Sequence, residues 1–240
     1  KAICKKFKRD NNLNYDVDQI VVSTGAKQSI ANVCMSLINK GDEVLIPTPY
    51  WVSYSAMVEL AEGVPVFINP DEDSNYKITA QQLDSAITDK TKMLMLNSPN
   101  NPSGSVFTEQ EYLEFSKVLL KYPNIIIVSD EIYEHINYGV KSVSFASLPG
   151  MYDRTVSVNG ISKAYAMTGW RIGYLGAPKV IAKACNKMQG QITSGANCIA
   201  QRATIKALEE SPAKIQYMVD EFKIRRDFII DLVTKINGFN

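Results

Sequence analysis

The sequence predicts an α/β fold built on a mainly parallel β-sheet. Seven short apolar runs with strand character alternate with segments of helical periodicity. Such alternation is typical of parallel strands joined by right-handed helical crossovers. The 240 residues include 45% hydrophobic and 21% charged side chains, the composition of a globular domain with a substantial core. No repeat, low-complexity tract or linker interrupts the chain, so we expect one domain over residues 1–240.

The expected strands are short and rich in β-branched or aliphatic residues. In chain order they cover residues 20–22, 44–46, 64–67, 92–96, 125–128, 155–158 and 172–175. The expected helices are amphipathic and cover residues 1–9, 28–38, 52–61, 79–87, 108–121, 179–188, 197–209 and 212–235. The clearest helix start is Thr108, because Glu111 follows three residues later and completes a capping box.

Charge and cysteine content exclude several classes of protein. The net charge of +1 predicts neither a nucleic-acid surface nor a basic membrane patch. The four cysteines are scattered without a CxxC pair, which is typical of cytoplasmic thiols rather than disulfides or zinc ligands. No apolar run reaches membrane-spanning length, and no signal peptide is recognisable. We therefore expect a cytoplasmic protein with small-molecule partners and no nucleic acid, membrane or metal among them.

Several expected strands are followed by residues suited to ligand binding, namely Gly25, Trp51, Asn101 and Asp130. In open α/β sheets, ligands bind beyond the carboxyl ends of the strands. The motif Ser-Thr-Gly-Ala-Lys lies between an expected strand and an expected helix. The backbone N–H groups of Gly25, Ala26 and Lys27 are therefore at the positive end of that helix, which predicts an anion site. The GxxxxGK[ST] spacing of a P-loop is absent. For this motif alone, a glycine needed only for a tight turn is the stronger interpretation.

One lysine, Lys163, lies in a polar turn after the expected strand 155–158, and Arg171 follows eight residues later. A lysine with an anion-binding arginine nearby suits an amine that forms a Schiff base with a phosphorylated aldehyde. The alternative for a lone lysine is a solvated loop side chain.

Three other candidates have local alternatives. Asp130 follows four aliphatic residues, so it should be partly buried and need a cationic or hydrogen-bonding partner, unless it caps a following helix. Trp51 follows Pro-Tyr at a loop tip, where it can stack on a flat ring or simply anchor the loop. Asn101 lies in a Pro- and Asn-rich stretch that could be only a turn.

The run over residues 162–174, Ser-Lys-Ala-Tyr-Ala-Met-Thr-Gly-Trp-Arg-Ile-Gly-Tyr, resembles the lysine segment of the aspartate aminotransferase family, the fold-type I enzymes that use pyridoxal phosphate. Residues 49–54, 97–104 and 130–133 resemble three further motifs of that family. One departure is Gly160, where some members of the family have a phosphate-binding serine.

The resemblance implies a role for each candidate. Lys163 is implied to be the catalytic lysine, Asp130 the partner of the pyridine nitrogen, and Tyr133 a ligand of the phenolic oxygen. Trp51 and Asn101 are also implied to contact the substrate. The full set implied to contact the cofactor is Gly25, Ala26, Lys27, Trp51, Asn101, Asp130, Tyr133, Ser162, Lys163 and Arg171.

For the whole chain, the resemblance implies the cofactor-binding large domain of such an enzyme, a three-layer α/β/α unit with a mostly parallel seven-stranded sheet. The implied protein is a homodimer that moves an amino group between an amino acid, aspartate in the first place, and a 2-oxo acid such as 2-oxoglutarate. The N-terminal arm, a partner-subunit tyrosine and the small domain with its carboxylate-binding arginine are expected outside residues 1–240. We therefore do not expect residues 1–240 alone to form a complete enzyme.

Alternatives remain at this level. One is another pyridoxal phosphate reaction on the same fold, by an aspartate/prephenate or aromatic aminotransferase or a β-lyase. A second is a non-catalytic aminotransferase-like sensing domain, and a third is a nucleotide-binding α/β domain, which the absent GxGxxG and Walker patterns disfavour. His135, the only histidine, is interpreted as structural, and Glu131 as a surface carboxylate or one that supports the site from behind.

Overall fold

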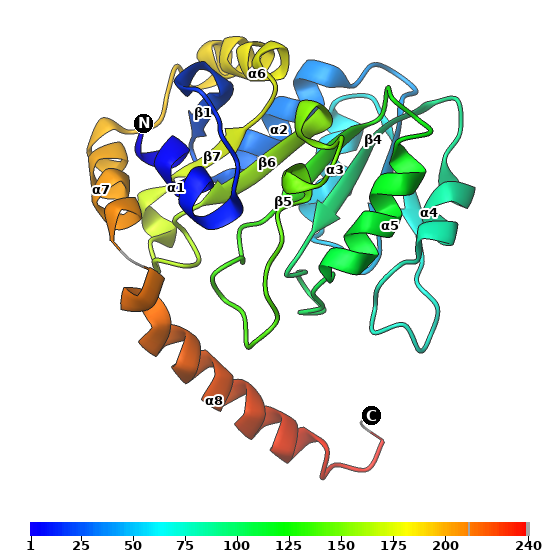
Figure 1. The fold of residues 1–240 in the computed structure, drawn as a ribbon, viewed down its shortest axis with the longest axis vertical. Helices are drawn as coiled ribbons and strands as arrows, with labels where there is room; N and C mark the ends of the chain where they lie inside the picture. The colour runs from blue at the N-terminus through cyan, green and yellow to red at the C-terminus, as the bar shows by residue number, and fades with distance from the viewer. Residues whose placement is uncertain (211, 239–240) are drawn as a thin grey trace.

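The computed structural model describes residues 1–210 and 212–238. They contain a seven-stranded sheet that is covered by helices (Figure 1). The strand order is β1-β7-β6-β5-β4-β2-β3. All neighbouring pairs are parallel except those made by β7, which is antiparallel to both β1 and β6. The predicted α/β architecture with a mostly parallel sheet of seven strands is confirmed.

The strands coincide with the seven predicted runs, with ends that differ by a few residues. They are β1 Ile20–Ser23, β2 Glu43–Pro47, β3 Val64–Ile68, β4 Thr91–Asn97, β5 Ile126–Asp130, β6 Thr155–Gly160 and β7 Gly173–Gly176. The helices are α1 Ala2–Asn11, α2 Ala26–Leu37, α3 Ser53–Leu60, α4 Ala80–Ala86, α5 Glu109–Leu119, α6 Lys179–Ile192, α7 Cys198–Glu209 and α8 Gln216–Val233. The capping box at Thr108 is present, with its side chain bonded to the N–H of Glu111.

Alternation along the strands separates two apolar layers. On β2 and β4, the side chains of Val44, Ile46 and Met93 pack under α2, α3 and α6, whereas Leu45 and Leu94 pack under α4 and α5. The face that holds α4 and α5 continues at the other end of the sheet under α1 and α7, which cover Tyr174 of β7. The result is the three-layer α/β/α arrangement that the resemblance implies.

Strand direction brings the candidate residues to one edge of the sheet. The strands β1, β2, β4, β5 and β6 all run the same way, so the segments that follow them begin at the same edge. Because β7 runs in the opposite direction, the segment that precedes it, with Arg171, reaches that edge as well.

Helix α8 extends away from the sheet and its covering helices (Figure 1). Large apolar side chains along it are exposed, including Phe222 at 44% and Phe228 at 62%. Within residues 1–210 and 212–238, every helix is too short or too polar to cross a lipid bilayer.

Candidate active site

A cavity of about 260 Å³ opens at the carboxyl edge of the sheet. Its lining comes from the segments after five strands and before β7, and consists of Ala26, Lys27, Trp51, Tyr54, Asn97, Asn101, Asp130, Ile132, Tyr133, Ser162, Lys163, Thr168 and Arg171. Every residue that the sequence analysis assigned to the cofactor is in this lining except Gly25, which directly precedes Ala26. Parallel strands thus gather residues that lie far apart in sequence.

One end of the cavity gathers groups of the kind that bind anions. Gly25 is the N-cap of α2 and has φ 86° and ψ 157°, a conformation that only glycine adopts readily. A Cβ atom at position 25 would lie 2.5 Å from Nη2 of Arg171, so the guanidinium lies against the start of α2. Nη1 of Arg171 donates a hydrogen bond to the carbonyl oxygen of Thr168 at 2.8 Å. A guanidinium and the first N–H groups of a helix therefore converge, as phosphate binding requires.

Another part of the cavity presents a buried carboxylate. Asp130 ends β5 and is only 5% exposed. Oδ2 accepts a hydrogen bond from the Tyr54 hydroxyl at 2.7 Å, and Oδ1 accepts one from the N–H of Ile132 at 3.2 Å. Burial raises the pKa of Asp130 to about 6, although both donors and the charge of Lys163 act in the opposite direction. No α-helix starts at Asp130, so the alternative of a helix cap is wrong.

A lysine and three aromatic side chains also line the cavity. Lys163 follows β6, and its Nζ lies 5.6 Å from the centre of the Tyr133 ring. The indole of Trp51 meets the ring of Tyr54 edge-on, with 5.4 Å between centroids, and Nζ of Lys27 lies 4.9 Å from the indole centroid. The cavity thus brings an amine, an aromatic face and a phenol together.

Two asparagines that the sequence analysis left without a role support the loops around the cavity. Asn97 accepts a hydrogen bond from the backbone N–H of Asn101 at 2.8 Å and donates one to the carbonyl oxygen of Asp130 at 2.9 Å. Asn100 donates to the carbonyl oxygen of Pro49 at 3.2 Å, next to the segment that carries Trp51. These contacts tie the loop after β4 to its neighbours on both sides.

Four lining residues were not predicted from the sequence, namely Tyr54, Asn97, Ile132 and Thr168. The local signal for Tyr54 is its position three residues after Trp51, in the same aromatic run over residues 49–54. Gly160 lies inside the sheet, where an added Cβ would meet Ile132 and the backbone of residues 172–173 at 3.0–3.1 Å. Gly160 is not part of the cavity lining. The phosphate-binding serine that some family members have at this position is therefore missing from a site outside the lining.

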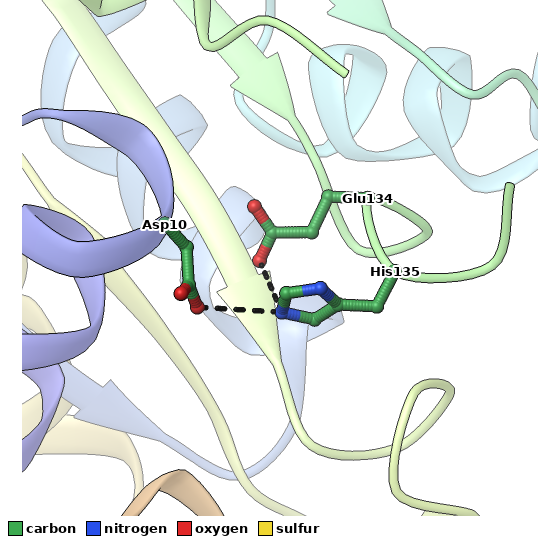
Figure 2. A group of neighbouring side chains, drawn as sticks. All are labelled: Asp10, Glu134 and His135. Carbon is green, nitrogen blue, oxygen red and sulfur yellow. Dashed lines mark ion pairs between the residues drawn. The ribbon is translucent and has the colours of Figure 1, made fainter. Parts of the chain in front are cut away.

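A second cluster of titratable groups lies outside the cavity. Figure 2 shows Nε2 of His135 facing two carboxylates, those of Asp10 and Glu134, each at 3.4 Å. The buried ammonium of Lys6 pairs with Glu134, and the guanidinium of Arg9 donates to both oxygens of Asp10 at 2.6 and 2.9 Å. Because cations already neutralise both carboxylates, we interpret the cluster as an ion-pair network that ties α1 to the turn after β5, and not as a metal centre.

The neighbouring Glu131 is buried, with 2% of its surface exposed, so the surface interpretation is wrong. One of its oxygens accepts hydrogen bonds from the hydroxyls of Ser129 and Ser144, both at 2.8 Å. Burial, together with the negative charge of Glu134, raises the pKa of Glu131 to about 7. It stabilises the segment behind Asp130 and does not line the cavity.

Comparison with known proteins identifies the family. The sequence model described as aminotransferase class I and II matches residues 1–240. The chain belongs to this family. Membership agrees with the resemblance found in the lysine segment and with the cavity at the carboxyl edge of the sheet.

Similar members of the aminotransferase family include plant and bacterial enzymes. A protein of Petunia hybrida named bifunctional aspartate aminotransferase and glutamate/aspartate-prephenate aminotransferase is 46% identical over 99% of this chain and 50% of its own length. An aspartate aminotransferase of Rhizobium meliloti is 45% identical over 100% of this chain and 59% of its own length. The crystal structure of the aspartate aminotransferase from Rhizobium meliloti matches with a TM-score of 0.97, covering 99% of this chain and 60% of that one. The chain thus spans about half to three-fifths of these relatives.

Proposed function

We propose that the complete protein is a pyridoxal phosphate-dependent aminotransferase that moves an amino group between aspartate and 2-oxoglutarate. The observation that carries the proposal is that Lys163, Asp130 and Arg171 line one cavity. The names of the relatives, aspartate aminotransferase among them, support the same amino donor. The name of the Petunia relative also includes prephenate, which makes that 2-oxo acid a second candidate acceptor.

The cavity fits the cofactor in three respects. The start of α2 and Arg171 offer donors to a phosphate, and the close approach at Gly25 leaves that space free of side chain. The buried Asp130 carboxylate needs a cation, and a protonated pyridine nitrogen is one. Lys163 supplies a primary amine in the same lining.

When bound, pyridoxal phosphate supplies an aldehyde that condenses with amines and a pyridine ring that accepts the electron pair of a deprotonated carbon. Arg171 and the N–H groups at the start of α2 would hold the phosphate, and Trp51 would cover the ring face. Asp130 would keep the ring nitrogen protonated, and Tyr133 with Asn101 would donate to the phenolic oxygen.

The amine of Lys163 would act as the general base and acid, taking the proton from the substrate α-carbon and delivering it to the cofactor carbon that carried the aldehyde. A base in this role must lie within reach of the reacting carbon. Lys163 meets that requirement in this proposal because it lies in the same lining as the ring-binding groups.

The proposal includes three broader assignments. Residues 1–240 are the cofactor-binding large domain, and the enzyme is a homodimer, as the family resemblance implies. The four cysteines of the chain are free thiols, which fits a cytoplasmic location. Light scattering on the purified complete protein measures the subunit number, and a monomeric mass at micromolar concentration would contradict the dimer.

The test is a visible absorbance spectrum of the complete natural protein with pyridoxal phosphate, before and after addition of aspartate. We expect a visible band that aspartate bleaches and 2-oxoglutarate restores, with oxaloacetate as product. The band should be absent in Lys163→Ala and unchanged in Lys187→Ala, a control at an exposed lysine of α6. A Lys163→Ala protein that keeps the band would refute the assignment. Release of a thiol, pyruvate and ammonia from a cysteine thioether offered in place of aspartate would favour a β-lyase.

A further inference from the structure

The buried hydroxyl of Tyr54 has no role in the function as proposed so far. Tyr54 lies in the first turn of α3 and is 3% exposed. Its hydroxyl is 2.7 Å from Oδ2 of Asp130. Burial and the negative charge of Asp130 raise the pKa of Tyr54 well above its ordinary value. The phenol therefore keeps its proton and donates a hydrogen bond to the carboxylate.

The ring of Tyr54 makes a second contact inside the same cavity. It meets the indole of Trp51 at an interplanar angle of 88° with 5.4 Å between centroids. An edge-to-face pair of this kind fixes the tilt of both rings. The hydroxyl of Tyr54 thus contacts the Asp130 carboxylate, and its ring contacts the indole of Trp51. Removing the hydroxyl alone breaks the first contact and keeps the second.

We propose that Tyr54 is a positioning residue that holds the Asp130 carboxylate ionised and correctly oriented for the pyridine nitrogen, an inference that rests on the proposed function. Two donors fix the carboxylate plane, the Tyr54 hydroxyl on Oδ2 and the N–H of Ile132 on Oδ1. With Oδ2 unbonded, the carboxylate would be held at one oxygen only and could rotate about its bond to Cβ.

The charge state of Asp130 also depends on this contact. The groups that act on it are the Tyr54 hydroxyl from α3, the N–H of Ile132 from its own segment and the ammonium of Lys163 from the turn after β6. Burial opposes all three and already raises the pKa of Asp130 to about 6. Loss of the hydroxyl would raise it further, so that a neutral acid would face the ring near pH 7.

The first experiment measures the pKa of Asp130 in the cofactor-free complete protein, by carbon NMR of labelled aspartate carboxyls, with Asp130→Asn to assign the signal. In Tyr54→Phe we expect this pKa to rise by about one pH unit or more, the effect of one hydrogen bond to a charged group. The control is Tyr122→Phe, which removes another tyrosine–aspartate bond, 3.1 Å to Asp84, outside the cavity. An unchanged pKa in Tyr54→Phe overturns the inference.

The second experiment is a double-mutant cycle on pyridoxal phosphate affinity. Tyr54→Phe should weaken binding about tenfold in the wild-type background and by less than about twofold with Asn at position 130, because the hydroxyl acts through the charge of Asp130. Equal losses in both backgrounds would mean that Tyr54 only packs, which overturns the inference. If Tyr54→Phe does not fold, the test uses 3-fluorotyrosine at position 54, which has a similar shape and is a stronger hydrogen-bond donor. This replacement should lower the pKa of Asp130, and an unchanged pKa would overturn the inference.

These outcomes separate the inference from the proposed function. A wild-type protein that shows no visible band with pyridoxal phosphate refutes the proposed function. The pKa of Asp130 in the cofactor-free protein is still measurable in that case, and it decides whether Tyr54 controls the charge of the carboxylate.

Discussion

Replacement of Gly25 by alanine tests the anion end of the cavity directly. The new Cβ would lie 2.5 Å from Nη2 of Arg171, so the guanidinium must withdraw by roughly 1 Å to restore an ordinary contact of about 3.5 Å. The end of an arginine side chain is flexible, so the fold tolerates this movement. The proposed phosphate contact would not tolerate it, because a charge-assisted hydrogen bond depends on its geometry.

The magnitude follows from the value of one such bond. A hydrogen bond to a charged group contributes about 1.5–3 kcal/mol, so we expect Gly25→Ala to bind pyridoxal phosphate about 10- to 150-fold more weakly. The backbone at φ 86° and ψ 157° adds a stability loss of about 1–3 kcal/mol. Affinity for pyridoxal, which lacks the phosphate, should stay nearly constant, and fluorescence titration of both compounds measures the ratio.

A matched control is Gly41→Ala. Gly41 also has φ 86°, yet an added Cβ there meets no atom within 4 Å. This variant should lose stability through backbone strain and keep its preference for the phosphorylated compound. If Gly25→Ala kept the full preference as well, the close approach of Arg171 to the start of α2 would have no part in phosphate binding, and the reasoning would be wrong.

Three further predictions concern stability. Lys6→Met leaves the buried carboxylate of Glu134 without its cation and should lower the free energy of unfolding in urea by about 3–5 kcal/mol. The control Lys8→Met, at an exposed lysine of the same helix, should lower it by under about 0.5 kcal/mol, and equal losses would contradict the prediction. Arg154→Met removes hydrogen bonds to three carbonyl groups at the end of α5 and in the turn before β5. It should cost about 2–3 kcal/mol, so an unchanged urea midpoint would count against this prediction. The pKa of Glu131 is 4.5 in the unfolded chain and about 7 in the folded state, so between these values only the folded state holds the proton. The contribution of Glu131 to the free energy of unfolding therefore falls as pH rises through that window. Glu131→Gln should flatten this slope between pH 5 and 8.

Much of the fold was predictable because its signals are local. Apolar runs marked all seven strands, and the Thr108 capping box marked the start of α5. The reversed direction of β7 has no such signal, since residues 172–175 would suit a strand in either direction. The helix ends were less accurate, and α6 continues to Ile192, beyond the predicted residue 188, because its last turn keeps Gln189 buried against β1.

The candidate site was also predictable only where its signals are local. Strand ends and family motifs together predicted most of the lining, because parallel strands deliver the residues that follow them to one edge. The partnership of Tyr54 with Asp130 joins residues 76 positions apart, and no local pattern specifies it. The burial of Glu131 likewise depends on Ser144, 13 residues further along the chain, which supplies one of its hydrogen bonds.

The antiparallel pairing of β6 with β7 has a consequence for how this enzyme family can vary. Gly160 faces Gly173 across the two strands, so the segment that carries both Lys163 and Arg171 is a loop with a closed base. The spacing between amine and guanidinium is therefore set within one short hairpin, independently of the crossover helices elsewhere. Insertions in those helices leave the spacing intact, whereas a single deletion inside the hairpin loop would shift one group relative to the other.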